Sequence, residues 1–172
     1  DRGKDLNISE DLIEDFGERI KDSIRNWSTP KKQSTGLRMS NIGRPARQLW
    51  YDQKDKPDIK LMPSTQIKFL YGHLLEEVII LLVKLAGHTV SDEQKEVSVD
   101  GIKGHIDCKI NGEVIDIKTA SGRAFSKFSQ GTLSEDDPFG YMAQLSGYEE
   151  SEGTDSGGFL AINKESGELA LH

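Results

Sequence analysis

Two acidic residues and a lysine near the middle of the chain have types and spacing that suit metal-assisted chemistry. The segment GHIDCKINGEVIDIKTAS, residues 104–121, contains two runs of alternating apolar residues joined by Asn111-Gly112, the strongest short-range signal for a β-hairpin. A two-residue turn at this point would set Asp107 directly opposite Asp116. Like charges at directly opposed positions destabilise a strand pair. We therefore expect a bound cation to offset the repulsion between the two acids.

The face of this hairpin that carries the two acids also carries basic groups. Because side chains alternate along a strand, Lys118 lies on the same face as Asp116, and we expect His105 on the partner strand opposite Lys118. Two carboxylates that hold a hard cation through oxygen, while the ion keeps several waters, are typical of Mg²⁺ sites. A nearby ammonium would orient or deprotonate a water molecule, or stabilise developing negative charge. These are the parts that metal-assisted hydrolysis of a phosphodiester requires.

A third carboxylate comes from a long apolar segment upstream. Residues 64–86 predict a helix that is apolar nearly all round, which is typical of a helix buried on more than one side. At about 100° per residue, Glu76 falls on an apolar stripe, where a carboxylate is costly unless it is paired or bound to a metal. Glu77 falls on a narrow polar wedge with His73 and Lys84, and we expect it to be a solvated partner of one of them. Glu76, rather than Glu77, is therefore the helical acid that we expect at the metal site.

The length and composition of the chain fit one globular domain with a substantial core. It has 172 residues, 35% of them hydrophobic and 30% charged, which is ordinary for such proteins. The longest apolar run, residues 78–83, is too short to span a bilayer, so we expect no membrane association, and no signal peptide is visible. A single cysteine, Cys108, excludes an internal disulfide or a cysteine-ligated cluster and favours a reducing compartment.

The charge distribution favours a polyanionic partner, although the net charge of −7 does not. Residues 25–51 include six basic residues and no acid, and residues 117–134 include three basic residues and no acid. Local basic patches determine where a polyanion docks, whereas net charge mainly sets solubility and steering. Phe125 and Phe128 interleave with the second patch and would either stack on single-stranded bases or fill a local core. The alternative for both patches is an ordinary solvated loop.

The elements that must position these groups follow from periodicity and turn residues. Ser9 can cap a first helix, and Ser64 or Thr65 can cap the long one. The other expected elements are loops at 52–63 and 122–137, strands at 89–90 and 96–99 and in the hairpin, a helix at 139–150, and a final hairpin of residues 159–163 and 168–171. This order predicts an α/β or α+β fold with a mixed sheet, in which an N-terminal helix and basic loop (1–37) precede the main domain (38–172).

These motifs together resemble those of the PD-(D/E)XK nuclease superfamily. GHIDC followed by EVIDIKT is similar to its core of an Asp, a spacer and Asp/Glu-x-Lys, with Ile106-Asp107 in place of the common Pro-Asp. GHLLEEVIILL is similar to its first, helical motif, in which Glu76 takes the place of the acid. YMAQLSGY is similar to the QxxxY motif of the RecB-like and CRISPR-adaptation branch, with Gln144 and Tyr148 one helical turn apart.

A segment upstream extends the resemblance, which covers about residues 38–171 in all. SNIGRPARQLW is similar to the N-terminal motif of the same branch, in which a basic residue approaches DNA, and Arg47 matches that residue. Some members carry cysteines here for an iron–sulfur cluster. This chain has Pro45 at the corresponding position, so we expect no iron–sulfur cluster.

The resemblance implies a restriction-endonuclease-like core and a Mg²⁺- or Mn²⁺-dependent deoxyribonuclease, closest to RecB-like, phage-type exonucleases of DNA recombination, repair or phage replication. It implies single-stranded DNA or duplex ends as the partner and the cytoplasm of a bacterial or phage-infected cell as the location. Lys118 would position the attacking water. The implied metal ligands are Glu76, Asp107, Asp116 and the Ile117 carbonyl. With the second basic patch included, the expected DNA-binding residues are Arg47, Ser121, Arg123, Lys127, Gln144 and Tyr148.

Two rival functions remain open. A structure-selective endonuclease would use the same site, and a catalytically inactive DNA-binding or scaffold protein would keep the fold without the chemistry, although the intact set of acids and lysine disfavours the latter. Single motifs also have simpler interpretations. Asp116 and Lys118 could form a salt bridge on a surface strand, and Gln144 and Tyr148 could lie on an ordinary helix surface.

Overall fold

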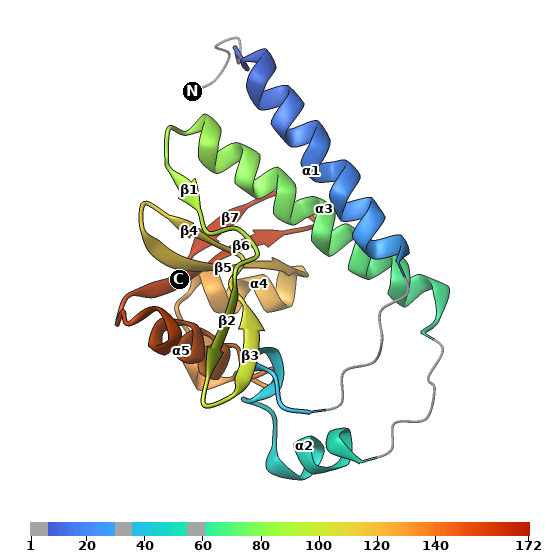
Figure 1. The fold of residues 1–172 in the computed structure, drawn as a ribbon, viewed down its shortest axis with the longest axis vertical. Coiled ribbons are helices and arrows are strands. Elements are labelled where there is room, and N and C mark those ends of the chain that lie inside the picture. The colour runs from blue at the N-terminus through green and yellow to red at the C-terminus, as the bar shows by residue number, and fades with distance from the viewer. Residues whose placement is uncertain (1–6, 30–35, 55–60) are drawn as a thin grey trace.

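The chain folds around a mixed five-stranded sheet with helices on both faces (Figure 1). The computed structural model describes residues 7–29, 36–54 and 61–172. The sheet has the strand order β1 (Val90–Ser91), β4 (Cys108–Ile110), β5 (Glu113–Ala120), β6 (Gly157–Asn163) and β7 (Leu169–Leu171). β5 and β6 are parallel, and the other neighbouring strands are antiparallel. The expected α/β architecture with a mixed sheet is confirmed.

A second, two-stranded sheet is formed by β2 (Glu96–Val99) and β3 (Ile102–His105). The expected 104–110 strand is therefore two separate strands, β3 and β4, which belong to different sheets. His105 pairs with Glu96 across β2 and β3, so its expected position opposite Lys118 is wrong.

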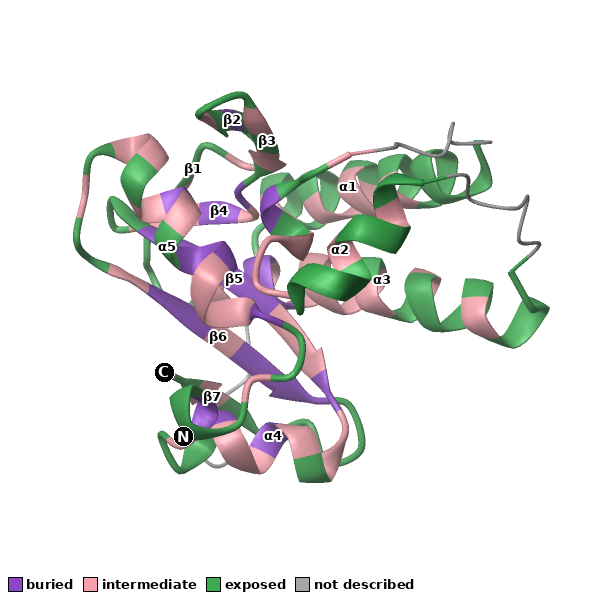
Figure 2. Cartoon of the chain, turned by 90° about the horizontal axis from the view of Figure 1, so that it is seen from below, coloured by how far each residue is buried: buried purple, intermediate pink, exposed green. Residues whose placement is uncertain are grey.

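Three helices cover the main sheet and divide its interior into two apolar cores. They are α3 (Pro63–Leu85), α4 (Gly122–Ser129) and α5 (Tyr141–Glu152). On one face, Ile79 of α3 packs in a cluster with Ile115 of β5. On the other face, Phe128 of α4 packs in a cluster with Val114 of β5. Because side chains alternate along β5, this strand contributes to both cores, and buried residues gather on β5 and β6 (Figure 2).

Helix α1 (Glu10–Ser28) lies along α3 rather than on the sheet (Figure 1). No residue of this described helix is buried, and polar contacts fasten it. Lys84 Nζ lies 2.7 Å from Asp15 Oδ2, and Trp27 Nε1 donates to the carbonyl of Gln66 at 2.9 Å. The helix of the expected N-terminal segment thus packs directly against α3.

The segment that carries Arg47 consists of a 3₁₀ turn (Met39–Asn41) and helix α2 (Ala46–Gln53). Between them, Gly43 packs against Gly140 so closely that a Cβ on either glycine would collide with the backbone of the other. This contact holds the upstream motif segment against the start of α5. Part of the expected basic patch, residues 30–35, lies outside the described residues, as does part of the expected 52–63 loop.

Helix α4 and a 3₁₀ turn (Leu133–Glu135) replace the loop that was expected at 122–137. Phe125 and Phe128 are one helical turn apart and both are buried. Their burial stabilises a helix in a segment whose glycine and serine content does not favour one. The two phenylalanines therefore belong to the core and do not offer a stacking surface.

The start of α3 also differs from expectation. Pro63 is its first residue and Met62 is in the capping position, so neither Ser64 nor Thr65 caps it. Proline is favoured at the first helical position because its missing N–H is not needed there. Ser9, by contrast, does cap α1, since its Oγ accepts a hydrogen bond from the N–H of Leu12.

Local turn chemistry is confirmed in the central hairpin. Cys108 pairs with Ile115, and the turn between the strands has positive φ at both Asn111 and Gly112, as the Asn-Gly signal predicts. β6 and β7 form the expected final hairpin. None of the helices in the described ranges combines the length and the apolar character that a bilayer span requires.

Candidate metal centre

The candidate metal centre lies where β4 stops pairing with β5. The last pair is Cys108 with Ile115. Two residues before Cys108, the N–H of Ile106 already donates to the carbonyl of Lys95 at 3.1 Å. The chain thus leaves β5 to join the segment before β2, and this departure leaves a notch beside the second half of β5.

Asp107 fills the notch with its side chain. Its Oδ2 accepts a hydrogen bond from the backbone N–H of Ile117 at 2.7 Å, where a strand partner would otherwise accept it. The direct strand pairing expected between Asp107 and Asp116 is therefore wrong. The two acids are nevertheless close neighbours, since the charge of Asp116 contributes to raising the pKa of Asp107.

Asp116 is 1% exposed and is held by a network from α5 and from its own strand. Its Oδ2 forms an ion pair with Lys118 Nζ. Its Oδ1 accepts from Gln144 Nε2 at 3.2 Å, and the same nitrogen donates to the hydroxyl of Tyr148 at 2.9 Å. Lys118 also donates to Gln144 Oε1 at 3.4 Å. Gln144 and Tyr148, which are both buried, thus hold the acid rather than lying on an ordinary helix surface.

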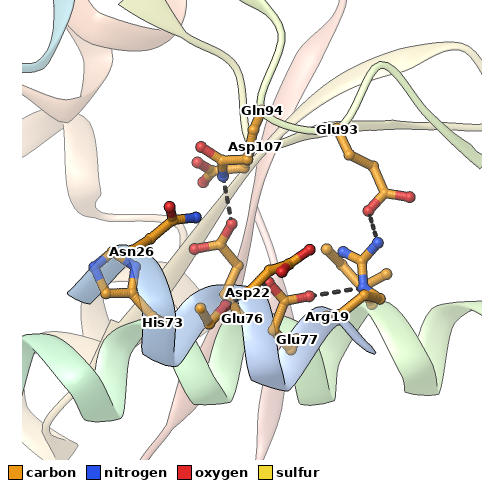
Figure 3. A pocket seen from close by; sticks show the side chains of 11 residues that line it. Arg19, Asp22, Asn26, His73, Glu76, Glu77, Glu93, Gln94 and Asp107 are labelled. Carbon is orange, nitrogen blue, oxygen red and sulfur yellow. Dashed lines mark hydrogen bonds and ion pairs between the residues drawn. The ribbon is translucent and has the colours of Figure 1, made fainter. Parts of the chain in front are cut away.

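Glu76 approaches the notch from α3, and Glu77 does not. Glu76 accepts a hydrogen bond from Gln94 Nε2 at 2.7 Å, and its carboxylate points toward Gln94 and Asp107 (Figure 3). Glu77 faces α1 and pairs with Arg19 Nε at 2.7 Å. The two adjacent acids therefore have different surroundings, as the helical wheel predicts, and Glu77 has in Arg19 of α1 a partner that the sequence did not indicate.

Burial and mutual repulsion raise the pKa of the carboxylates at this centre. Burial raises the pKa of Glu76 to about 7, with a further contribution from Glu77 that outweighs the hydrogen bond from Gln94. Burial, then the charges of Asp116 and Glu76, raise the pKa of Asp107 well above its usual value. Burial also raises the pKa of Asp116, against the stabilising charge of Lys118. Additional positive charge nearby would therefore stabilise the ionised form of each acid.

Lys118 is the cation that the notch itself provides. Burial alone would lower the pKa of its ammonium, but the carboxylates of Asp116 and Asp107 outweigh burial, and the pKa lies above its usual value. Lys118 therefore stays protonated at neutral pH. One ammonium faces three carboxylates, and this imbalance leaves the centre short of positive charge.

The donor set fits a hard divalent cation in chemistry, although the side chains are turned to protein partners. Among the described residues, no three acidic, histidine or cysteine side chains are close enough together to hold one ion. Glu76 is turned to Gln94 and Asp107 to the Ile117 N–H. Because the N–H and C=O of one strand residue point to the same side, the carbonyl of Ile117 also faces the notch. All-oxygen donors with excess negative charge are what Mg²⁺ or Mn²⁺ prefers.

A cavity of about 420 Å³ beside Glu76 and Asp107 is closed by α1 (Figure 3). α1 contributes Arg19, Asp22, Ser23 and Asn26 to its lining. Sequence reasoning missed these residues and Gln94, because their role depends on how α1 packs against α3 and on where the segment before β2 passes. The one available signal was the polar wedge on α3, which indicates a polar partner for that face.

The residues expected to bind DNA differ in their surroundings. Arg47 on α2 and Arg123 on α4 are exposed. Lys127 is engaged, because its Nζ lies 2.5 Å from Asp136 Oδ2. Ser121 occupies the capping position of α4 without a side-chain capping bond. Tyr148 is only 2% exposed, so its hydroxyl contacts Gln144 and not the surface.

Comparison with known proteins does not identify this chain. No family model and no curated protein matches it. Among solved structures, it is similar to the crystal structure of SSO0001, at 17% sequence identity and a TM-score of 0.43, over 94% of this chain and 76% of that one.

Proposed function

We propose that this protein is a divalent-metal-dependent DNA nuclease with a restriction-endonuclease-like core of the PD-(D/E)XK type. One observation carries the proposal. Glu76 of α3, Asp107 just before β4 and Asp116 of β5 approach one another, and all three have raised pKa values. Buried acids that outnumber their cations destabilise a purely structural site. A hard cation bound through oxygen would relieve that cost.

The chain's own residues have separate roles in this proposal. A divalent cation held by Glu76, Asp107, Asp116 and the Ile117 carbonyl would supply Lewis acidity to a phosphodiester and lower the pKa of a water molecule. Lys118 carries a proton on Nζ, and this ammonium would donate to the attacking water or stabilise negative charge on the phosphate oxygens. Gln144, outside the proposed ligand set, would keep Asp116 in place.

The proposed substrate is DNA. The exposed arginines Arg47 and Arg123 would contact the phosphate backbone of DNA. The preference for exonuclease activity follows from the resemblance to RecB-like, phage-type exonucleases, and a structure-selective endonuclease with the same residues is the second candidate. A catalytically inactive DNA-binding protein is an outcome that the experiment must be able to detect.

The test is a digestion series with one defined variant. Wild-type protein and Asp116→Asn are incubated with single-stranded, linear duplex and supercoiled circular DNA in Mg²⁺, Mn²⁺, Ca²⁺ or EDTA. We expect products only with wild-type protein in Mg²⁺ or Mn²⁺. Cleavage of linear but not circular DNA would indicate an exonuclease, and nicking of circles an endonuclease. Absence of cleavage in every divalent metal, or equal cleavage by the variant, would contradict the proposal.

A further inference from the structure

Three hollows meet at the carboxyl ends of β5 and β6. The first, of about 250 Å³, lies between α3 and β5 and is lined in part by Lys68, Glu76 and Thr119. The second, of about 200 Å³, lies beside α4 and includes Lys118, Thr119 and Lys164. A third, of about 510 Å³, shares Lys68 with the first and Lys164 with the second. Because neighbouring hollows share these residues, they lie side by side around the strand ends, and the first also reaches Glu76. We call the three hollows together the β5–β6 groove.

The groove sits where the topology favours ligand binding. β5 and β6 are the parallel pair of the sheet, and their carboxyl ends coincide at Ala120 and Asn163. The N–H of Lys164 donates to the carbonyl of Ala120 at 3.0 Å, which ties the two strand ends together. Ligands commonly bind outside the carboxyl ends of parallel strands, because the side chains that follow both strands converge there.

The groove is less acidic than the cavity beneath α1, although Asp136 and Asp137 line its α4 side. Lys68 and Lys164 are exposed, and within the described ranges neither ammonium has an ion-pair partner. The cavity beneath α1 has Arg19 as its basic side chain, and that arginine is already paired with two carboxylates. The acids of that cavity are Asp22, Glu76, Glu77, Glu93 and Asp107. A polyanion would therefore meet less repulsion on approaching the metal centre from the groove than from the α1 side.

Aromatic rings border the groove on both sides. Phe139 is 59% exposed and stacks on Tyr141, with ring centroids 5.4 Å apart, and Tyr141 in turn lies 4.6 Å beneath the ammonium of Lys118. Tyr71, on the α3 side, is 58% exposed. One face of Phe139 is covered by Tyr141, so its remaining surface is available to a further planar group. Exposed rings beside lysines suit a strand whose bases are unpaired, because paired bases keep their faces inside the duplex.

We propose that the β5–β6 groove binds single-stranded DNA, with Lys68 and Lys164 on its phosphates and a base stacked on Phe139, and leads the strand to the metal centre. This inference rests on the proposed nuclease function and adds the form of the substrate and its direction of approach. It assigns DNA contacts to residues other than Arg47, and predicts that a duplex end must unpair before its strand reaches Lys118.

Binding in EDTA tests the groove without cleavage. Anisotropy of a labelled oligothymidylate is titrated over a salt series with wild-type protein, with Lys68→Gln/Lys164→Gln, and with the matched control Lys21→Gln/Lys103→Gln. The control removes two exposed lysines elsewhere, each in a surface ion pair that contributes little. We expect the groove variant to bind about tenfold more weakly at low salt and its log–log salt slope to flatten by about 1.4, which corresponds to two lost phosphate contacts on a single strand. The control variant should keep the affinity and the salt slope of wild type.

Stacking is tested separately. Phe139→Ala should weaken binding of the oligothymidylate roughly 5- to 100-fold with an unchanged salt slope. An abasic strand of the same length offers no base, so wild type and Phe139→Ala should bind it equally. Phe139→Leu serves as the second variant, since it keeps apolar volume over Tyr141 while removing the ring. Thermal melting checks that each variant is folded.

The outcomes separate this inference from the proposed function. If wild type cleaves DNA but the groove variant binds like the control, the assignment of DNA binding to the groove is wrong and the nuclease proposal stands. If Phe139→Ala loses as much affinity for the abasic strand as for the normal one, the proposed stacking of a base on Phe139 is wrong. If wild type binds single strands through the groove yet cleaves nothing in any divalent metal, the nuclease proposal is wrong. If wild type binds no DNA at all, both are wrong.

Discussion

Gln144 connects α5 to the acid at the centre of the site, because its Nε2 lies 3.2 Å from Asp116 Oδ1. The same nitrogen lies 2.9 Å from the hydroxyl of Tyr148, and Gln144 Oε1 accepts from Lys118 at 3.4 Å. Asp116 therefore sits between an ammonium and an amide, and the amide is itself held by a buried tyrosine. Gln144 and Tyr148 therefore hold Asp116 in position.

Removing the amide of Gln144 should lower stability and slow cleavage more than removing the hydroxyl of Tyr148. Gln144→Leu would leave Asp116 Oδ1 without its hydrogen bond in a buried site, so we expect a loss of about 1–3 kcal/mol in the free energy of unfolding. We expect cleavage to slow about 10- to 100-fold through misplacement of Asp116. Tyr148→Phe should cost about 0.5–1.5 kcal/mol and slow cleavage less. Urea unfolding and cleavage rates of the folded variants measure both, and a wild-type rate in Gln144→Leu would show that Asp116 does not depend on it.

Removing either strand acid should abolish cleavage while the fold remains. In Asp107→Asn, the new side-chain oxygen can still accept from the N–H of Ile117, and in Asp116→Asn the repulsion on Asp107 is lost. The melting temperature in EDTA should therefore stay level or rise. Mg²⁺ at about 100 times its Kd should stabilise wild type by about 2.7 kcal/mol and each variant much less. Equal stabilisation of wild type and both variants would place the metal elsewhere.

The two adjacent acids of α3 should separate metal binding from helix packing. Glu76→Gln should weaken Mg²⁺ binding and slow cleavage, because this side chain faces Asp107. Glu77→Gln should change Mg²⁺ affinity much less than Glu76→Gln does, but lower the free energy of unfolding by about 1–3 kcal/mol, since it breaks the contacts with Arg19 and Ser23 that fasten α1. Calorimetric Mg²⁺ titration and urea unfolding distinguish the two, and a weaker Mg²⁺ affinity in Glu77→Gln alone would reverse the assignment.

The parts of the fold that the sequence predicts are those fixed by local chemistry. The Asn111-Gly112 turn alone sets the register of β4 and β5, and the phase of a helix alone directs Glu76 and Glu77 to different sides. In each case the determining interactions span only a few residues. Both predictions concern geometry that neighbouring side chains and backbone angles decide.

The parts that sequence reasoning missed depend on contacts between distant segments. The point at which β4 begins is set by the hydrogen bond from Ile106 to Lys95, which no local pattern encodes. The role of α1 at the cavity depends on Arg19 meeting acids of other segments. Helix α4 is stabilised by burial of Phe128 beneath a sheet whose order was not known in advance.

Stability without metal should fall as the pH rises through the range in which Glu76 titrates. Its pKa is raised from 4.5 to about 7 in the fold, so between these values the folded protein keeps a proton that the unfolded chain releases. This contribution is fully present below about pH 4.5 and is lost above about pH 7, up to about 3 kcal/mol. Urea unfolding at pH 5 and pH 8 in EDTA should show a larger difference for wild type than for Glu76→Gln. Saturating Mg²⁺ should shrink or reverse it, because the bound form needs the deprotonated acid.

The contact between Gly43 and Gly140 should make one small substitution disruptive and leave another harmless. A Cβ at residue 43 would meet the backbone of residue 140, with the carbonyl oxygen at 2.6 Å, and neither backbone can yield without shifting a motif segment. We expect Gly43→Ala to cost about 1–3 kcal/mol, as overpacking does. We also expect it to slow cleavage, because the start of α5 positions Gln144. The control is Gly17→Ala within α1, where a Cβ meets nothing within 4 Å and alanine should stabilise the helix by about 0.5–1 kcal/mol. Shifts of opposite sign in the melting temperature would support the contact, and equal shifts would show that the two segments are free to separate.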